Sequence, residues 1–161
     1  MRDHYETVLW SGHFLFLATG TLQAESLFPD RVFIPIYTGH YYEVPSDETQ
    51  PQDFTPGVYG SWDNRILSLD YGFGILNDSF QDLAFQVSVG KGWDLGPDAV
   101  AGVFWGYRRA FDDTASNTEG LSFPAFYATY KNVFINTVGG VVDGTLQGIV
   151  TFGLKFDLTP R

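Results

Sequence analysis

The sequence predicts an all-β protein, an eight-stranded antiparallel transmembrane β-barrel with a partly hollow lumen. Three observations carry this prediction. The composition is unusual for a soluble globule, with 17% aromatic residues, 18 glycines and only 17% charged residues in 161 residues. From Arg31 onward, bulky apolar side chains alternate with small or polar ones. The alternating segments have nearly constant length, and their number is even.

The strand-length segments follow one another along the chain, each bounded by Gly, Pro, Asn or Asp. They cover residues 31–42, 55–62, 65–76, 82–92, 99–110, 120–130, 132–142 and 146–158. Strands that cross a bilayer in a barrel need about 9–11 residues. Tight turns at Asp63-Asn64 and Lys131-Asn132 contrast with long polar loops at 43–54 and 111–119, as in outer-membrane barrels.

The alternation also predicts which face of each strand is outside. In one segment the bulky residues are Leu83, Phe85, Val87 and Val89, and the opposite face carries Ala84, Gln86, Ser88, Gly90 and Gly92. A soluble lipocalin-like barrel would place its bulky residues inside. Small and polar residues leave too little volume to fill such a core, so we expect the bulky face to meet lipid and the glycine-rich face to border the lumen.

Residues 1–24 resemble an export signal, because the apolar core 13–22 is followed by the small residue Ala24. The region before the core carries Arg2 but also Asp3 and Glu6, which leaves a second interpretation open. The segment could instead be an amphipathic helix that lies in the membrane interface. On either interpretation, residues 25–161 form the barrel.

Charge and metal-ligand counts exclude several classes of function. The formal net charge is −10, and the nine Lys and Arg residues are scattered, so nucleic acid is not an expected partner. The chain has no cysteine, and His4, His13 and His40 lack metal-ligand spacing. We therefore expect no metal and no cofactor.

Four motifs occur in a fixed order along the chain: FIPIYTGH at 33–40, TPGVYG at 55–60, Asp78-Ser79, and GKGW at 90–93. Together they resemble the lipid A palmitoyltransferase family of bacterial outer-membrane acyltransferases, and the resemblance spans about residues 31–158. Members of that family are eight-stranded barrels with a hydrocarbon-binding lumen. They transfer a palmitoyl chain from a phospholipid to lipid A. The resemblance thus implies an acyl-chain-sized lumen, a glycerophospholipid donor, lipid A as acceptor and a monomer in the outer membrane.

The resemblance implies that His40, Asp78 and Ser79 are the catalytic residues. Histidine is the side chain best suited to proton transfer near neutral pH, so His40 is the candidate base. Ser79 is either the nucleophile or a hydroxyl that positions the ester or stabilises the oxyanion. Asp78 would orient the imidazole or stabilise its cation. Because neighbouring strand residues point to opposite faces, Asp78 and Ser79 can serve one site only where the strand has broken into a loop.

Six further residues are candidates for binding and passage of the substrate. Ser88, Gly90 and Gly92 share the inward face, and the resemblance implies that Gly92 forms the floor of a hydrocarbon ruler. Pro35, Pro56 and Pro124 match positions where missing N–H donors weaken the barrel wall and admit lipid, with Pro35 and Pro56 expected on the first two strands and Pro124 on the sixth. The alternative function is a non-enzymatic small barrel for adhesion or surface protection, in which Asp78-Ser79 is only a turn.

Overall fold

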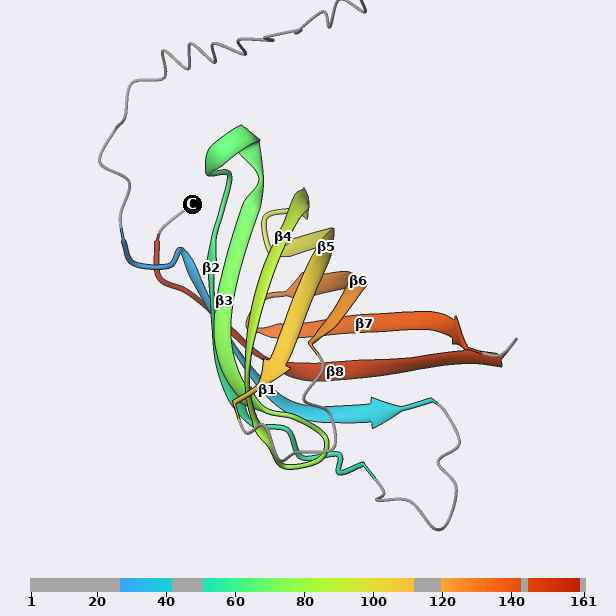
Figure 1. The fold of residues 1–161 in the computed structure, drawn as a ribbon. Helices are drawn as coiled ribbons and strands as arrows, with labels where there is room; N and C mark the ends of the chain where they lie inside the picture. Colours follow the sequence, from blue (N-terminus) through green and yellow to red (C-terminus); the bar gives the residue numbers. More distant parts are fainter. Residues whose placement is uncertain (1–26, 42–50, 112–119, 143–144, 160–161) are drawn as a thin grey trace, which may run out of the picture.

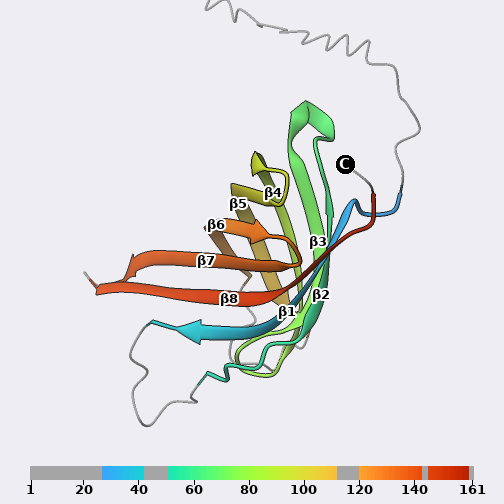
Figure 2. The same ribbon diagram turned by 180° about the vertical axis from the view of Figure 1, so that it is seen from behind.

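The computed structural model describes residues 27–41, 51–111, 120–142 and 145–159, and within them every strand belongs to one closed antiparallel barrel. Figures 1 and 2 show the strands following one another in chain order, with β8 returning to lie beside β1. The strands are β1 (Arg31–His40), β2 (Gly57–Trp62), β3 (Asp70–Asn77), β4 (Leu83–Gly96), β5 (Ala99–Ala110), β6 (Leu121–Tyr130), β7 (Val133–Val142) and β8 (Thr145–Asp157). The predicted fold class of an eight-stranded antiparallel barrel is confirmed.

The predicted strands agree with the observed ones to within a few residues at most ends. The predicted strand at 99–110 has the same bounds as β5. The segment 82–92 extends further, because β4 continues to Gly96 before turning into β5. The predicted segment 1–24 and much of the loops 43–54 and 111–119 lie outside the described residues.

The first half of the predicted segment 65–76 is not a strand. Residues Ile66–Ser68 form a 3₁₀ turn, and Leu67 and Ser68 have φ angles of 59° and 57°. The backbone N–H of Arg65 donates to the carbonyl of Leu69 at 2.8 Å, which closes this turn. A turn is present at Asp63-Asn64 as predicted, but the prediction that it leads directly into the next strand is wrong, because the whole stretch from Asp63 to Leu69 connects β2 to β3.

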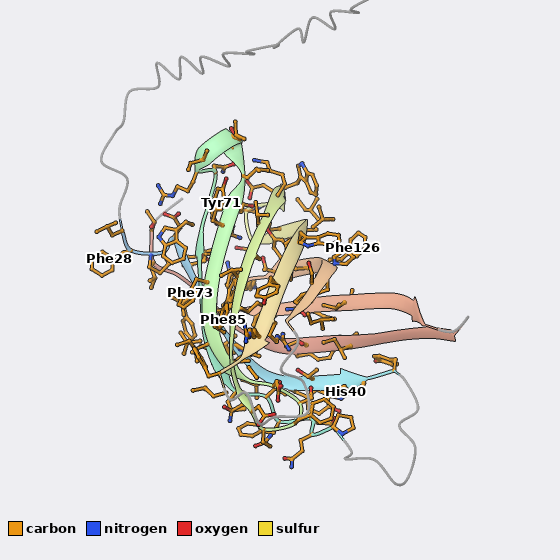
Figure 3. All side chains as sticks on the ribbon, in the orientation of Figure 1. Phe28, His40, Tyr71, Phe73, Phe85 and Phe126 are labelled. Atoms are coloured by element: carbon orange, nitrogen blue, oxygen red, sulfur yellow. The ribbon has the colours of Figure 1, made fainter. Side chains whose placement is uncertain are left out.

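The outside of the barrel is apolar, as the alternation predicts. Each strand carries an exposed large apolar side chain: Ile36, Val58, Phe73, Val87, Val103, Phe126, Ile135 and Phe152. Figure 3 shows Phe73 and Phe126 projecting away from the barrel. On β4 the inward residues Ala84 and Gln86 are buried, whereas Val87 and Val89 are exposed. No helix in the described ranges has the length and apolar content needed to cross a bilayer.

Charged residues form ion pairs at the end of the barrel that carries Asp63, here called the Asp63 end. Arg31 Nε donates to Asp63 Oδ1 at 3.1 Å, and Arg65 Nη2 donates to Asp30 Oδ2 at 2.9 Å. Burial alone would raise the pKa of the Asp30 carboxyl. Hydrogen bonds from the backbone N–H of Asp63 and the Thr159 hydroxyl, together with the Arg65 charge, outweigh burial and lower that pKa below its ordinary value.

Candidate active site at the His40 end

His40 and Ser79 lie in hydrogen-bond contact at the end of the barrel opposite Asp63, here called the His40 end. His40 is the last residue of β1, and Ser79 lies just after the end of β3. His40 Nε2 is 2.8 Å from Ser79 Oγ. Both side chains are largely shielded from solvent, with 7% of the His40 side chain and 9% of Ser79 exposed. Figure 3 shows His40 at the tip of β1. The sequence therefore identified two residues that the fold brings together.

The Asp78 carboxylate shapes the turn that presents Ser79. Its Oδ1 accepts the backbone N–H of Phe80 at 2.8 Å and that of Asp82 at 3.0 Å. Gln81 has a φ of 70°, so the chain reverses sharply here. The break in the strand that a shared site requires is confirmed, since β3 ends at Asn77. The sequence predicts that Asp78 orients the imidazole of His40 or stabilises its cation. In the structure Asp78 Oδ1 instead accepts backbone N–H groups of its own turn.

A different carboxylate faces the imidazole. Asp53 Oδ1 lies 3.6 Å from His40 Nδ1, the ring nitrogen that does not contact Ser79. Tyr37 Oη donates to Asp53 Oδ2 at 3.1 Å, and the backbone N–H of Thr38 donates to the Asp53 carbonyl at 2.7 Å. These contacts hold Asp53 against β1 at the His40 end. Ser79, His40 and Asp53 thus lie in the sequence hydroxyl, imidazole, carboxylate. This arrangement can activate an oxygen nucleophile.

Sequence reasoning missed Asp53 because it lies in a stretch predicted to be an acidic surface loop. Its position depends on residues 53–55 running back along β1, where Tyr37 pairs with Phe54 in an isolated bridge. The one signal in the sequence is that the loop containing Asp53 starts next to His40. Several acidic residues share that loop, and nothing in their spacing distinguishes Asp53.

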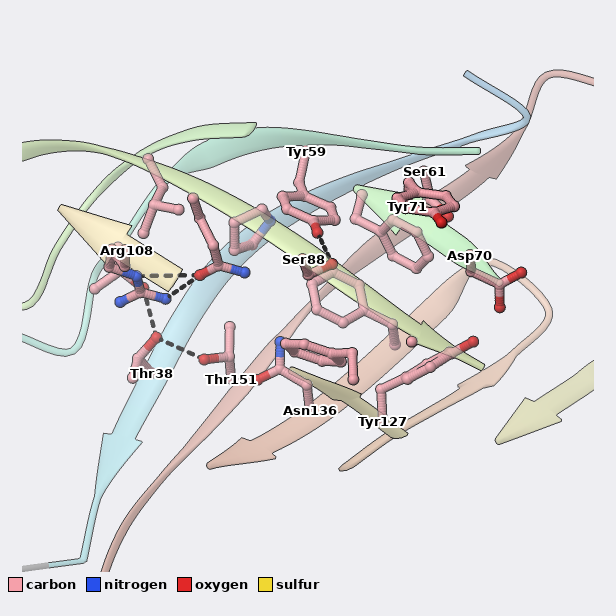
Figure 4. A pocket seen from close by; sticks show the side chains of 18 of the residues that line it. Thr38, Tyr59, Ser61, Asp70, Tyr71, Ser88, Arg108, Tyr127, Asn136 and Thr151 are labelled. Atoms are coloured by element: carbon pink, nitrogen blue, oxygen red, sulfur yellow. Dashed lines mark hydrogen bonds between the residues drawn. The ribbon is translucent and has the colours of Figure 1, made fainter. Parts of the chain in front are cut away.

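A cavity of about 100 Å³ lies inside the barrel beneath these residues (Figure 4). Thr38 is one of its lining residues and lies two residues before His40 on the same face of β1. His40 therefore lies just beyond the lining at one end of the cavity, here called its mouth. The Thr38 hydroxyl lies 2.6 Å from that of Thr55 and 3.2 Å from that of Thr151. Apolar side chains form much of the remaining wall: Phe33, Pro35, Leu76, Phe104 and Phe134.

Two of the three predicted substrate-binding residues line this cavity directly. Ser88 and Gly90 border it, and the Ser88 hydroxyl contacts Tyr59 Oη. Gly92 lies behind the lining residue Tyr127. A Cβ added at Gly92 would overlap Tyr127 Oη and lie 3.2 Å from Asp70 Oδ2. Only a residue without a side chain lets Tyr127 take its present place in the cavity wall.

The barrel wall is interrupted near two of the three predicted gate prolines. The β1–β2 ladder ends at Phe33, two residues before Pro35, and the described chain resumes contact at the Tyr37 bridge. In β6, residues from Ala125 onward pair with β7, whereas Pro124 pairs only with β5. The prediction that Pro56 lies on the second strand is wrong, because β2 begins at Gly57. Pro56 still borders the wall, since its carbonyl accepts the N–H of Asn77 at 2.9 Å.

Among the described residues, no group of three or more His, Cys, Asp or Glu side chains could hold a metal ion. No protein-family model and no curated protein matches the chain. Three features of the structure bear on its function. They are the Ser79–His40–Asp53 arrangement, the cavity beneath it and the apolar exterior of the barrel.

Proposed function

We propose that this protein is a bacterial outer-membrane acyltransferase that moves a palmitoyl-type chain from a glycerophospholipid to lipid A. The observation that carries the proposal is the 2.8 Å contact between His40 Nε2 and Ser79 Oγ at the mouth of an interior cavity. A hydroxyl paired with an imidazole can accept and pass on an acyl group. A cavity with apolar walls can take the chain of that group.

The apolar exterior supports a place in the bilayer. Large apolar side chains face outward on every strand, and a monomeric soluble protein rarely exposes so continuous an apolar surface. A closed barrel pairs its backbone groups around the ring, which is what a chain in the hydrocarbon layer requires. The two interruptions of the wall, near Pro35 and at Pro124, would let lipid enter sideways from that layer.

The chemistry would proceed through an acyl-serine. His40 Nε2 takes the proton of the Ser79 hydroxyl while Ser79 Oγ attacks the carbonyl carbon of the donor ester. The bond from that carbon to the glycerol oxygen breaks, and His40 returns the proton to the leaving oxygen. A hydroxyl of lipid A then attacks the acyl-serine, again losing its proton to His40, and Ser79 regains its own. Asp53 would stabilise the imidazolium formed in each half-reaction.

The decisive experiment supplies purified protein with a phospholipid labelled in its palmitoyl chain and with lipid A. Mass spectrometry should show lipid A heavier by one palmitoyl chain and an equal amount of lysophospholipid. Quenching in the absence of acceptor should trap the palmitoyl group on the peptide that contains Ser79. Lipid A that stays unchanged with every phospholipid donor would overturn the proposal and favour a non-enzymatic surface barrel.

A further inference from the structure

Arg108 is a cation inside the barrel that the proposed chemistry does not use. It comes from β5 and projects into the cavity (Figure 4). Its Nε and Nη2 both donate to Gln86 Oε1, at 3.1 and 2.7 Å. Its guanidinium carbon also lies 5.8 Å from the centre of the Phe123 ring. Gln86 and Phe123 therefore hold the guanidinium in a defined orientation, although neither carries a charge.

Three other cations of the barrel have a carboxylate partner, and Arg108 differs from them. Arg31 pairs with Asp63, Arg65 with Asp30, and Lys155 with Asp157. Within the part of the chain that the structure describes, no carboxylate lies in ion-pair contact with Arg108. Asp78 attracts it only over a longer distance, and Asp78 Oδ1 is already bound by two backbone N–H groups.

A guanidinium in such an interior has unused capacity to bind an anion. It has five N–H donors in a planar fork, and a single amide oxygen occupies only part of them. A buried charge without a partner is unfavourable, so an anionic group that enters the cavity gains a strong interaction there. A carboxylate fits the fork best, because its two oxygens can accept two parallel hydrogen bonds.

The rest of the cavity indicates what such a carboxylate would be attached to. Phe33 and Phe134 meet edge to face, with ring centres 5.2 Å apart, and Phe104 and Leu76 add apolar wall. Arg108 lies near the mouth, because its register partner Gln86 is two residues from Ala84, the inward residue next to the end of β4 at the His40 end. The cavity thus combines a cationic group near its mouth with aromatic and aliphatic side chains among its wall residues, and this matches an anionic amphiphile.

We propose that this cavity binds a free long-chain fatty acid, with the carboxylate on Arg108 and the chain between the aromatic walls. The inference rests on the proposed function in one respect, since it takes the donor acyl chain as the competing occupant. A bound fatty acid would fill the space beneath His40 and Ser79. It would therefore inhibit acyl transfer in competition with the donor phospholipid, whereas a neutral chain of the same length would inhibit far less.

Binding of palmitate and of hexadecanol to the purified barrel tests the carboxylate contact. Both probes have the same chain length. Titration calorimetry is carried out in the same detergent micelles for every variant, so partitioning of the probe into the micelles is equal and cancels when variants are compared. We expect native protein to bind palmitate about 10- to 100-fold more tightly than hexadecanol, the ratio that a charged hydrogen bond of about 1.5–3 kcal/mol gives. Arg108→Met should lose this preference and keep its affinity for hexadecanol.

Two further variants provide a second test of the anion contact and a control. Gln86→Glu places a carboxylate against Arg108 and should abolish the preference even if Arg108→Met fails to fold. Arg109→Met changes the neighbouring, outward-facing arginine and should bind both probes as the native protein does. Equal affinity of the native protein for palmitate and hexadecanol, or a preference retained in Gln86→Glu, would overturn the inference.

The test of palmitate binding can succeed or fail independently of the test of acyl transfer. His40→Ala should bind palmitate with native affinity although its acyl transfer is about 10²- to 10⁴-fold slower, because His40 does not belong to the anion contact. Arg108-dependent palmitate binding in a protein that never modifies lipid A would support the anion site and contradict the acyltransferase. Acyl transfer by native protein that palmitate and hexadecanol inhibit equally would contradict the anion site alone.

Discussion

Asp53 Oδ1 and His40 Nδ1 lie 3.6 Å apart, on the side of the imidazole away from Ser79. A carboxylate in this place favours the tautomer whose proton sits on Nδ1, which leaves Nε2 free to accept the Ser79 proton. More than half of the Asp53 side chain is exposed, so solvent weakens the interaction. The structure therefore identifies Asp53 as a positioning residue for the proposed base.

Asp53→Asn should lower kcat for acyl transfer by about 10- to 100-fold with little change in KM. This is less than the roughly 10⁴-fold loss seen when a serine-protease triad loses its buried aspartate, because Asp53 is partly exposed. Steady-state kinetics with a labelled phospholipid measures both parameters. Asp98→Asn is the matched control, because that residue is exposed in the β4–β5 turn at the opposite end. Native kcat in Asp53→Asn would show that the imidazole needs no carboxylate.

His40→Asn and Ser79→Ala should each reduce acyl transfer by about 10²- to 10⁴-fold, the contribution typical of general acid–base catalysis. His40 is the terminal residue of β1, paired with Ile149 of β8, and Ser79 follows the end of β3, so neither substitution changes the interior of the barrel and the barrel should remain folded. Heat-modifiable migration on gels reports the fold, and mass spectrometry of lipid A reports the activity. A folded His40→Asn protein with native activity would contradict the mechanism.

Asp78→Asn should transfer acyl chains at close to the native rate, whereas Asp78→Ala should lose about 10- to 100-fold. The asparagine side chain keeps an oxygen that can accept the N–H groups of Phe80 and Asp82. Alanine removes that oxygen and lets the turn displace Ser79, and small displacements of a reacting group are costly. A large loss in Asp78→Asn would instead show that the negative charge of Asp78 is required.

Gly92→Met should shift the preferred donor toward shorter acyl chains while the transfer chemistry is retained. Any side chain at this position must push Tyr127 Oη, which the added Cβ would overlap, into the cavity. Each methylene excluded from an apolar pocket costs about 1–3 kcal/mol in discrimination. Competition between phospholipids of graded chain length measures the profile. Trp93→Met, at the adjacent exposed position, should leave the profile unchanged, and a uniform loss at all lengths in Gly92→Met would indicate a packing defect.

Asp30 should make the barrel less stable in acid. Its pKa is lowered in the folded protein from the ordinary 3.8, so its stabilising effect is complete above about that pH. The effect is lost as the pH falls from there through the lower folded pKa, because protonation is easier in the unfolded chain. Urea midpoints at pH 5 and pH 3 should therefore differ less in Asp30→Asn than in native protein. Equal differences in both proteins would contradict this role.

Alternation of apolar and polar residues predicts the position of most strands and which of their side chains face outward. A side chain on a strand points to one face because of backbone geometry alone, so alternation correctly predicts Val87 and Val89 outside and Gln86 inside. The same reasoning locates β5 from Ala99 to Ala110. It fails at Leu67, where alternation continues through a turn whose positive φ angles no periodic pattern reveals.

For the candidate site, the sequence by itself determined which residues could do the chemistry, and the tertiary structure decided which of them meet. His40 and Ser79 stand out by their types and motifs, and closure of the barrel brings them to 2.8 Å. Asp53 takes the place expected for Asp78 because of how its loop returns along β1. Among the residues that the structure describes, Arg108 contacts the amide oxygen of Gln86 and no carboxylate, because of what faces it across the lumen. Contacts of this kind join segments distant in the chain, so they depend on the register of the closed barrel. No local sequence pattern predicts them.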